Sequence, residues 1–496
     1  MADATAVDIF KFDNSYARLP EQFGVRMAPI PVGEPRLLAA NTGVARLLGV
    51  DAGWLASAAG VAALAGNVVP LGAEPMAMAY AGHQFGGFSP QLGDGRAILL
   101  GETVGRDGVR RDVQLKGSGR TPFSRGGDGR AAVGPVLREY IMSEAFAALG
   151  IPTTRSLAAV ATGETVRRET ELPGAVLTRV AQSHVRVGTF QYFAARGDVA
   201  SVRLLADYVI GRHYPDVEDA DNRYVALLEA VMTRQAALVS QWQHVGFIHG
   251  VMNTDNTSIV GETIDFGPCA FMDGYNPSQV YSSIDHSGRY AYDNQPRIVQ
   301  WNLARLAETL LPLLADDEDK AIASAQAALD GFAKTFADAY TAGMRRKLGL
   351  IRADAGDLKL GVNLLELMAK SSSDFTLTWR KLSEAGEAGS GDLALRAQFT
   401  DANGLDTWLT AWRQRSTEDG SDASERRTLM QSANPAFIPR NHRVEEALAA
   451  ATVGDLDPFH ALLRVLAKPY DDQPEFAEYQ DPPRPDQIVR ATFCGT

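Results

Sequence analysis

Residues 249–256 read HGVMNTDN, and residues 264–267 read IDFG. Together they place two carboxylates, Asp255 and Asp265, and the amide of Asn256 close together in the chain. Hard oxygen ligands of this kind suit Mg²⁺ or Mn²⁺, which keep several waters and bridge the phosphates of nucleotides. The two stretches therefore predict a site for a metal-bound nucleotide.

The same loop differs from a kinase-type catalytic loop at one position. In such loops an Asp two residues after the His positions the nucleophile, while an Asn and the Asp of Asp-Phe-Gly hold magnesium. Here Val251 stands in place of the first Asp, so either the chain does not transfer phosphate or another carboxylate acts. Asp255 is the available base, with Asn256 and Asp265 as metal ligands and His249 as a structural brace. The alternative is that Asp255 only caps a turn and the site merely binds ATP.

The chain upstream of this loop carries strand and helix patterns in a fixed order. Apolar residues predict strands around 97–104 and 109–116, joined by a polar turn. Helical spacing predicts a helix from about residue 133 and another over 224–244, and most of the chain from there to about 385 is expected to be helical. The order indicates an α+β fold of the protein-kinase type, with a β-containing N-lobe and a mainly helical C-lobe.

Lys116 ends the second strand, and Glu139 lies in the helix that follows it. A kinase-like site needs a Lys on a strand that binds the phosphates and a Glu on a helix that forms an ion pair with this Lys. Either residue alone is typical of a solvated charge, but the ordered set favours a nucleotide site. We expect four parts: an extension packed on the core over 1–80, the N-lobe over 81–205, the C-lobe over 206–385, and a helical extension and tail over 386–496.

Two glycine-rich stretches precede these elements, GDGR at 93–96 and GGDGR at 126–130. Their backbone amides could approach phosphate oxygens, although simple turns explain them equally well. The chain has no Gly-x-x-x-x-Gly-Lys-Ser/Thr sequence, which excludes a P-loop, and GSGRTP lacks the third glycine of a dinucleotide fingerprint.

Composition limits the partners. The 496 residues are 45% hydrophobic and 22% charged, as in ordinary globular proteins, and the net charge of -12 argues against nucleic acid or an anionic membrane as a partner. The N-terminus does not resemble a secretory signal or transit peptide, and no apolar stretch is long enough to span a bilayer, so we expect a cytoplasmic protein. Two cysteines, Cys269 and Cys494, are too few for a disulfide scaffold or a Cys-rich zinc module.

Four long stretches of the chain resemble the selenoprotein O family, and the similarity extends from near FDNSYARLP to the C-terminal cysteine. The stretches are AYAGHQFGGFSPQLGDGRAILLGE, DVQLKGSGRTPFSRGGDGRAAVGPVLREYIMSEA, LTRVAQSHVRVGTF and HGVMNTDNTSIVGETIDFGPCAFMD. The resemblance implies a kinase-like fold that binds ATP in a reversed orientation and transfers AMP to Ser, Thr or Tyr hydroxyls of protein substrates, with pyrophosphate leaving. Reversal places the outer phosphates in the pocket that adenine fills in a kinase, so that pocket would need positive charge. ATP with Mg²⁺ or Mn²⁺ is the expected requirement.

The resemblance also assigns site residues, position by position. Asp255 matches the proton acceptor, Asn256 and Asp265 match the metal ligands, and Glu139 pairs with Lys116. Residues that match the nucleotide-binding set are Gly93, Gly95, Arg96, Lys116, Asp128, Gly129, Arg179 and Arg186. Taken without the resemblance, Arg179 and Arg186 are typical of exposed strand or loop charges.

Redox control is associated with the same family, and some members carry selenocysteine where this chain has Cys494. Two reduced thiols are the usual state of cytosolic cysteines, but the terminal thiol could fold back. We therefore hypothesise a reversible Cys269–Cys494 disulfide, with thiol-redox proteins as partners. Three functions remain open: an AMP-transferring enzyme, which is favoured; a conventional kinase, which Val251 argues against; and a catalytically silent ATP-binding scaffold.

Overall fold

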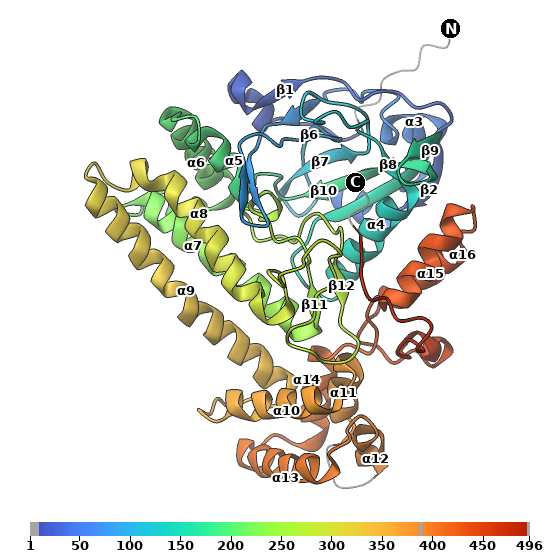
Figure 1. Cartoon of the computed structure of the whole chain (residues 1–496). Coiled ribbons are helices and arrows are strands. Elements are labelled where there is room, and N and C mark those ends of the chain that lie inside the picture. The colour runs from blue at the N-terminus through green and yellow to red at the C-terminus, as the bar shows by residue number, and fades with distance from the viewer. Residues whose placement is uncertain (1–8, 386–389, 494–496) are drawn as a thin grey trace.

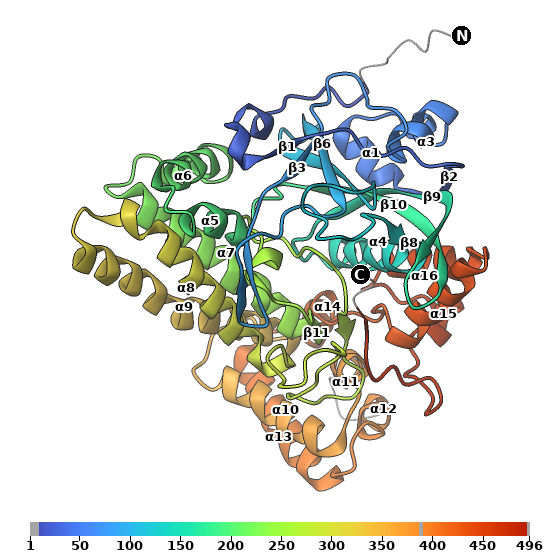
Figure 2. The same cartoon turned by 45° about the horizontal axis from the view of Figure 1, so that its top comes forward.

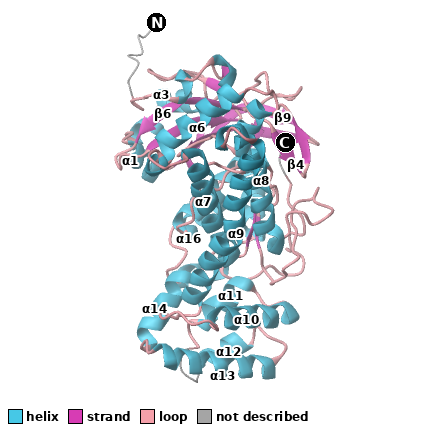
Figure 3. Cartoon of the chain, turned by 90° about the vertical axis from the view of Figure 1, so that its left-hand side faces the viewer, coloured by secondary structure: helices cyan, strands magenta, loops and turns pink. Residues whose placement is uncertain are grey.

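A β-sheet lies at one end of the molecule and the helices extend from it toward the other end. The computed structural model describes residues 9–385 and 390–493. Figure 1 shows the sheet at the top, helices α7 to α9 below it, and helices α10 to α14 at the far end. Figure 3 shows the same separation from the side, with the strands gathered above a column of helices. The α+β fold class predicted from the sequence is confirmed.

Antiparallel pairing joins the strands of the main sheet. Their order is β1 (Gly24–Arg26), β3 (Met76–Met78), β6 (Ala97–Val104), β7 (Arg110–Lys116), β10 (Glu171–Ala181), β9 (Arg155–Arg167) and β2 (Arg36–Ala40), and β8 (Ala131–Ala132) pairs with β10. The predicted hairpin at 97–104 and 109–116 is confirmed as β6 and β7. Three strands of this sheet come from the first 80 residues, so the segment expected to pack on the core contributes to the sheet itself.

Helices cover both faces of the sheet. On one face, α1 (Thr42–Leu48), α2 (Ala52–Leu55) and α3 (Ala58–Leu64) pack apolar side chains against β6, β7, β9 and β10. On the other face lies α4 (Val133–Ala148), the predicted helix that carries Glu139. Its apolar residues, which recur at helical spacing, are buried against the sheet and the helices below it. The end of β7 and the middle of α4 therefore face each other.

Below the sheet lies a helical part that contains the HGVMNTDN loop. Its elements are α5 (Val187–Ala194), α6 (Val199–His213), α7 (Arg223–Val245), α8 (Gln295–Leu314), α9 (Glu318–Lys347), α10 (Asp357–Ser371), α11 (Phe375–Leu382), α12 (Ser390–Arg396), α13 (Ala402–Asp419) and α14 (Ala423–Ala433). The helices α15 (Asn441–Thr452) and α16 (Asp457–Leu466) return to pack on α4. The helical character predicted to about residue 385 is confirmed, and the part boundaries stay predictions.

The loop begins where α7 ends. Gly246 caps this helix with a left-handed φ of 72°, a conformation that glycine adopts without steric cost. Next come β11 (Phe247–Ile248), the loop with its 3₁₀ turn η4 (Thr254–Asn256), and β12 (Ala270–Phe271), which pairs back onto β11. The loop is thus held at both ends, and η4 packs against α5. Within the residues that the structure describes, no helix combines the length and apolar character needed to cross a lipid bilayer.

Candidate active site

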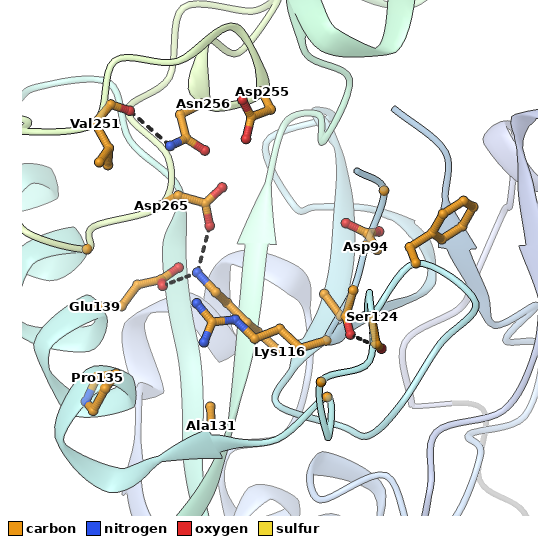
Figure 4. A pocket seen from close by; sticks show the side chains of 18 of the residues that line it. Asp94, Lys116, Ser124, Ala131, Pro135, Glu139, Val251, Asp255, Asn256 and Asp265 are labelled. Carbon is orange, nitrogen blue, oxygen red and sulfur yellow. Dashed lines mark hydrogen bonds and ion pairs between the residues drawn. The ribbon is translucent and has the colours of Figure 1, made fainter. Parts of the chain in front are cut away.

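A cavity of about 730 Å³ opens between the sheet, α4 and the loop after α7. That volume lies in the usual range of small-molecule sites. All the residues predicted to bind the nucleotide, to hold the metal or to act as the base line it: Gly93, Gly95, Arg96, Lys116, Asp128, Gly129, Glu139, Arg179, Arg186, Asp255, Asn256 and Asp265. The fold thus brings together residues that lie more than 170 positions apart in the chain. Figure 4 shows several of these side chains pointing into the cavity.

Lys116 forms the centre of an ion-pair network. Its Nζ lies 2.6 Å from Glu139 Oε2 and 2.6 Å from Asp265 Oδ1 (Figure 4). The predicted pairing of Lys116 with Glu139 is therefore present in the structure. Because Lys116 stands at the end of β7 and Asp265 follows the loop, this contact also ties the sheet to the helical part of the molecule.

Arg179 joins the same network from β10. Its Nη1 lies 2.7 Å from Asp265 Oδ1 and 3.2 Å from Glu139 Oε1. Gln114 on β7 accepts two further hydrogen bonds from this guanidinium, from Nη2 at 2.6 Å and from Nε at 3.2 Å, and donates one to Asp94 at 3.1 Å. The Arg179 side chain is only 2% exposed. The surface position expected from the residues alone is wrong, because neighbouring strands and carboxylates enclose the charge.

Arg186 is the second buried arginine, at the N-cap of α5. Its Nη2 lies 3.7 Å from Asp265 Oδ2, and its guanidinium stacks 4.4 Å from the ring centre of Tyr80. Its Nε, which is buried, has no hydrogen-bond partner among the described residues. Here too, the exposed charge expected without the family resemblance is wrong. Lys116, Arg179 and Arg186 thus place three cationic groups at the inner end of the cavity. Their carboxylate partners do not accept hydrogen bonds from all of the N–H donors of these three side chains.

These cations control the ionisation of Asp265. Burial alone would raise the pKa of this carboxyl, but Lys116, Arg179 and Arg186 hold the pKa well below its usual value. Asp265 also has a left-handed φ of 60°, which is uncommon for a residue other than glycine and is often found at functional sites. The residue is therefore an anion in a fixed orientation, which suits a carboxylate that binds a cation.

The loop itself is braced by local hydrogen bonds. His249 Nε2 donates to the carbonyl oxygen of Ile264 at 2.9 Å, and its ring stacks on Trp242, consistent with the predicted structural role. Asn256 Nδ2 donates to the carbonyl oxygen of Val251 at 2.9 Å (Figure 4). This bond fixes the amide so that its oxygen is left for the cavity.

Asp255 is buried at the edge of the cavity, with 7% of its surface exposed. Gln84 Nε2 donates to its Oδ2 at 3.1 Å, and Oδ1 has no hydrogen-bond partner among the described residues. Burial raises the pKa of Asp255 to about 6, although Gln84 and Arg186 act in the opposite direction. Val251 lines the same cavity with an apolar side chain. Position 251 thus contributes an apolar side chain to the cavity, and position 255 contributes a buried carboxylate.

The two glycine-rich stretches line the cavity and pack against the segment between them, residues 119–124. A Cβ on Gly93 would lie 2.3 Å from the Phe123 ring, and one on Gly129 would lie 2.2 Å from the backbone of Gly119. Glycine is required at both positions for this close approach and for their left-handed φ values. Asp128 accepts hydrogen bonds at 2.8 and 3.2 Å from Arg168, which anchors the second stretch to the β9–β10 turn.

Cys269 lies outside this arrangement. Cys269 is buried and is not among the residues that line the cavity. Cys494 lies outside the described residues. The last described segment nevertheless packs near Cys269, because Thr492 Oγ1 donates to the carbonyl oxygen of Pro268 at 2.5 Å.

Sequence reasoning from the catalytic and glycine-rich motifs missed four residues next to the predicted ones, and all of these except Gln114 line the cavity. They are Tyr80 beside Arg186, Asp94 and Gln114 behind Arg179, and Gln84 on Asp255. Neutral amides and a tyrosine carry no chemical signature by themselves. The only available signal was positional, since Gln114 lies two residues before Lys116 and so shares its face of the strand.

Comparison with known proteins identifies the family. The profile described as protein adenylyltransferase SelO matches residues 8–467. The chain belongs to the SelO family. The protein nucleotidyltransferase YdiU of Bradyrhizobium sp. strain BTAi1 is 64% identical over 489 residues, which make up 98% of this chain and 99% of the relative. The protein of the same name from Rhodopseudomonas palustris strain BisB5 is 61% identical over 488 residues, with 98% and 99% covered.

Membership in the SelO family confirms the family identified from the sequence motifs. It also shows that the chain is a nucleotidyltransferase, so the enzyme class predicted from the sequence is confirmed. The roles of individual residues in the reaction are not given by this membership and depend on the geometry described above.

Proposed function

We propose that this SelO-family protein binds ATP in the cavity and transfers AMP to Ser, Thr or Tyr hydroxyls of protein substrates, with release of pyrophosphate. The observation that carries the proposal is the pair of buried arginines, Arg179 and Arg186, beside Lys116 at the inner end of the cavity. One guanidinium group can donate two parallel hydrogen bonds to the oxygens of a phosphate. A nucleotide whose outer phosphates lie there presents its α-phosphorus toward the loop that carries Asp255.

Asp255 supplies the base that this reaction needs. Its carboxylate takes the proton of the acceptor hydroxyl, the hydroxyl oxygen forms a bond to the α-phosphorus, and the bond from that phosphorus to the bridging oxygen of the β-phosphate breaks. A general base works best when its pKa lies near the operating pH, and burial brings the pKa of Asp255 to about 6. The apolar Val251 at the kinase base position disfavours transfer of the γ-phosphate at the same site.

Asn256 and Asp265 fit a divalent cation, because an amide oxygen and an ionised carboxylate are the hard ligands that Mg²⁺ and Mn²⁺ take. Side chains of both residues and of Asp255 converge on one end of the cavity (Figure 4). When bound, the cation would neutralise phosphate charge and so assist departure of pyrophosphate. The remaining sites on the ion would be filled by phosphate oxygens and water.

Removal of the divalent cation should weaken ATP binding as well as activity. We expect ATP to raise the thermal unfolding midpoint less in EDTA than in Mg²⁺ or Mn²⁺, by an amount that corresponds to about tenfold in affinity. Asn256→Ala should abolish this difference, whereas binding measured in EDTA stays unchanged. A variant with the same metal-dependent shift as the wild type would remove Asn256 from the metal site.

Mass spectrometry tests the function directly. The purified protein and a mixed protein extract are incubated with ATP and Mg²⁺ or Mn²⁺, and hydroxyl residues are searched for AMP and for phosphate. We expect AMP on Ser, Thr or Tyr, and none with Asp265→Ala. Phosphate-sized additions would instead show a kinase, and no modification despite measurable ATP binding would show a silent scaffold.

A reversible disulfide between Cys269 and Cys494 is the proposed regulatory feature of the site. Cys269 lies four residues after Asp265 in the chain, and Thr492, two residues before Cys494, bonds to Pro268. An oxidised thiol-redox protein would accept the two electrons as its own disulfide is reduced. We expect no titratable thiol in the unfolded, oxidised protein and two after reduction. Two titratable thiols under oxidising conditions would exclude the disulfide.

A further inference from the structure

A small hairpin outside the main sheet lies against the catalytic loop. Its strands are β4 (Gly82–Gln84) and β5 (Gly87–Ser89), joined by a two-residue turn. Figures 1 and 2 show it in blue, extending from the sheet toward the helical part of the molecule. An isolated two-stranded hairpin is marginally stable in water, so its position depends on what it contacts.

Backbone hydrogen bonds attach the hairpin to residues next to Asp255. The amide N–H of His83 donates to Thr254 Oγ1 at 2.7 Å, and the N–H of Phe85 donates to Asn253 Oδ1 at 3.2 Å. Thr254 in turn donates to Gln191 on α5 at 2.6 Å. These contacts fix the hairpin relative to η4 without touching the nucleotide-binding residues.

The turn of the hairpin is held in a strained conformation. Phe85 has a left-handed φ of 50°, which costs a residue other than glycine on the order of 1 kcal/mol or more. Its N–H is also 3.2 Å from the hydroxyl of Tyr290, and its ring packs 5.0 Å from the Tyr290 ring. The surroundings therefore enforce this turn, and with it the direction of the Gln84 side chain.

Two hairpin residues contact the Asp255 carboxylate itself. Gln84 Nε2 donates to Oδ2 at 3.1 Å. The backbone of Gly82 lies directly over the same side chain, and a Cβ added there would lie 2.5 Å from Oδ1 and 2.9 Å from the Asp255 Cβ. The carboxylate is thus held by a hydrogen bond on one oxygen and by backbone packing on the other.

We propose that the β4–β5 hairpin is a positioning element for Asp255, with Gly82 and Gln84 as its positioning residues. A base contributes fully only when its oxygen is within reach of the acceptor hydroxyl, and a misplacement of about 1 Å costs on the order of 100-fold in rate. Gly82 keeps the space that the carboxylate occupies, and Gln84 fixes the rotation of the carboxylate about its Cβ–Cγ bond. The inference rests on the proposed AMP transfer.

Gly82→Ala tests the packing, and Gln84→Met tests the hydrogen bond. Both variants should lower kcat for AMP transfer, by about 100-fold for Gly82→Ala and about tenfold for Gln84→Met. The KM for ATP, and ATP affinity measured by calorimetry, should stay within about twofold of wild type. The matched control is Gly87→Ala in the same hairpin, where the nearest atom to an added Cβ is 3.5 Å away; its kcat should be unchanged.

Separate results would overturn the positioning role and the proposed function. Equal kcat for Gly82→Ala, Gln84→Met and Gly87→Ala would exclude the positioning role while AMP transfer stands. A parallel fall of kcat, ATP affinity and thermal midpoint in both variants would show that the hairpin only supports the fold. If Gly82→Ala does not fold, Gln84→Met decides alone. An inactive wild type that binds ATP would instead remove the proposed function, and the positioning role with it.

Discussion

Asp255→Asn is expected to lower the rate of AMP transfer by a factor of about 10² to 10⁴, the usual contribution of a general base. Asn has the same shape as Asp and can still accept the hydrogen bond from Gln84, so the surrounding contacts stay in place. ATP affinity, measured by calorimetry with Mg²⁺, should change by less than about threefold, because the outer phosphates contact other residues. Transfer above about a tenth of the wild-type rate would show that Asp255 is not the base.

The same substitution is expected to stabilise the fold. Burial raises the pKa of Asp255 to about 6 from its usual value of 3.8, which means that the ionised carboxylate is less stable here than in water. At neutral pH the neutral Asn avoids this cost, so the free energy of unfolding of the nucleotide-free protein should rise by about 3 kcal/mol. Denaturant unfolding of both proteins gives this difference.

Glu262→Gln is the matched control for both effects. Glu262 is also 7% exposed, burial raises its pKa to about 7, and its carboxylate accepts a hydrogen bond from the backbone of Gln182. It does not line the cavity. This variant should gain stability as Asp255→Asn does, and it should keep full AMP transfer. Loss of activity in both variants would mean that charge in this region matters in general, and that the position of the carboxylate does not.

Local signals in the sequence were sufficient to predict the catalytic loop and the elements that carry Lys116 and Glu139. A strand ends in a Lys, a helix with a buried stripe carries a Glu, and Asn256 lies nine residues before Asp265. Each of these patterns concerns residues near one another in the chain, and their order restricts how the elements pack. The structure therefore confirms the predicted β6–β7 hairpin and the helix α4 within a residue or two.

Features that depend on contacts between distant segments could not be predicted from local sequence patterns. The strands β1, β2 and β3 have three to five residues each, too few for a clear alternation, and they pair with each other or with strands far along the chain. The burial of Arg179 depends on Gln114 and on carboxylates from α4 and the loop. Only the family resemblance pointed to Arg179 as a phosphate ligand, since an isolated arginine in a strand is usually exposed.

Arg179→Met is expected to separate binding of the outer phosphates from binding of the nucleoside. If Arg179 contacts the outer phosphates, ATP affinity should fall by about 100-fold or more, whereas AMP affinity should change by less than about threefold. The variant also leaves Glu139 and Asp265 with one cation fewer in a buried network, so the free energy of unfolding should fall by about 3 to 5 kcal/mol. Calorimetry with ATP and AMP, together with denaturant unfolding, measures both effects.

Arg440→Met distinguishes a loss of phosphate contacts from a loss of stability. Arg440 is 1% exposed and bridges Asp273 and Asp374 at 2.7 and 2.6 Å, but it does not line the cavity. Its removal should destabilise the fold by a similar amount and leave the ratio of ATP to AMP affinity unchanged. Arg179→Lys, which keeps the charge but loses the paired donors, should lie between wild type and Arg179→Met. An equal loss of ATP and AMP affinity in Arg179→Met would contradict the reversed orientation, because the inner cations would then contact the phosphate that both nucleotides share.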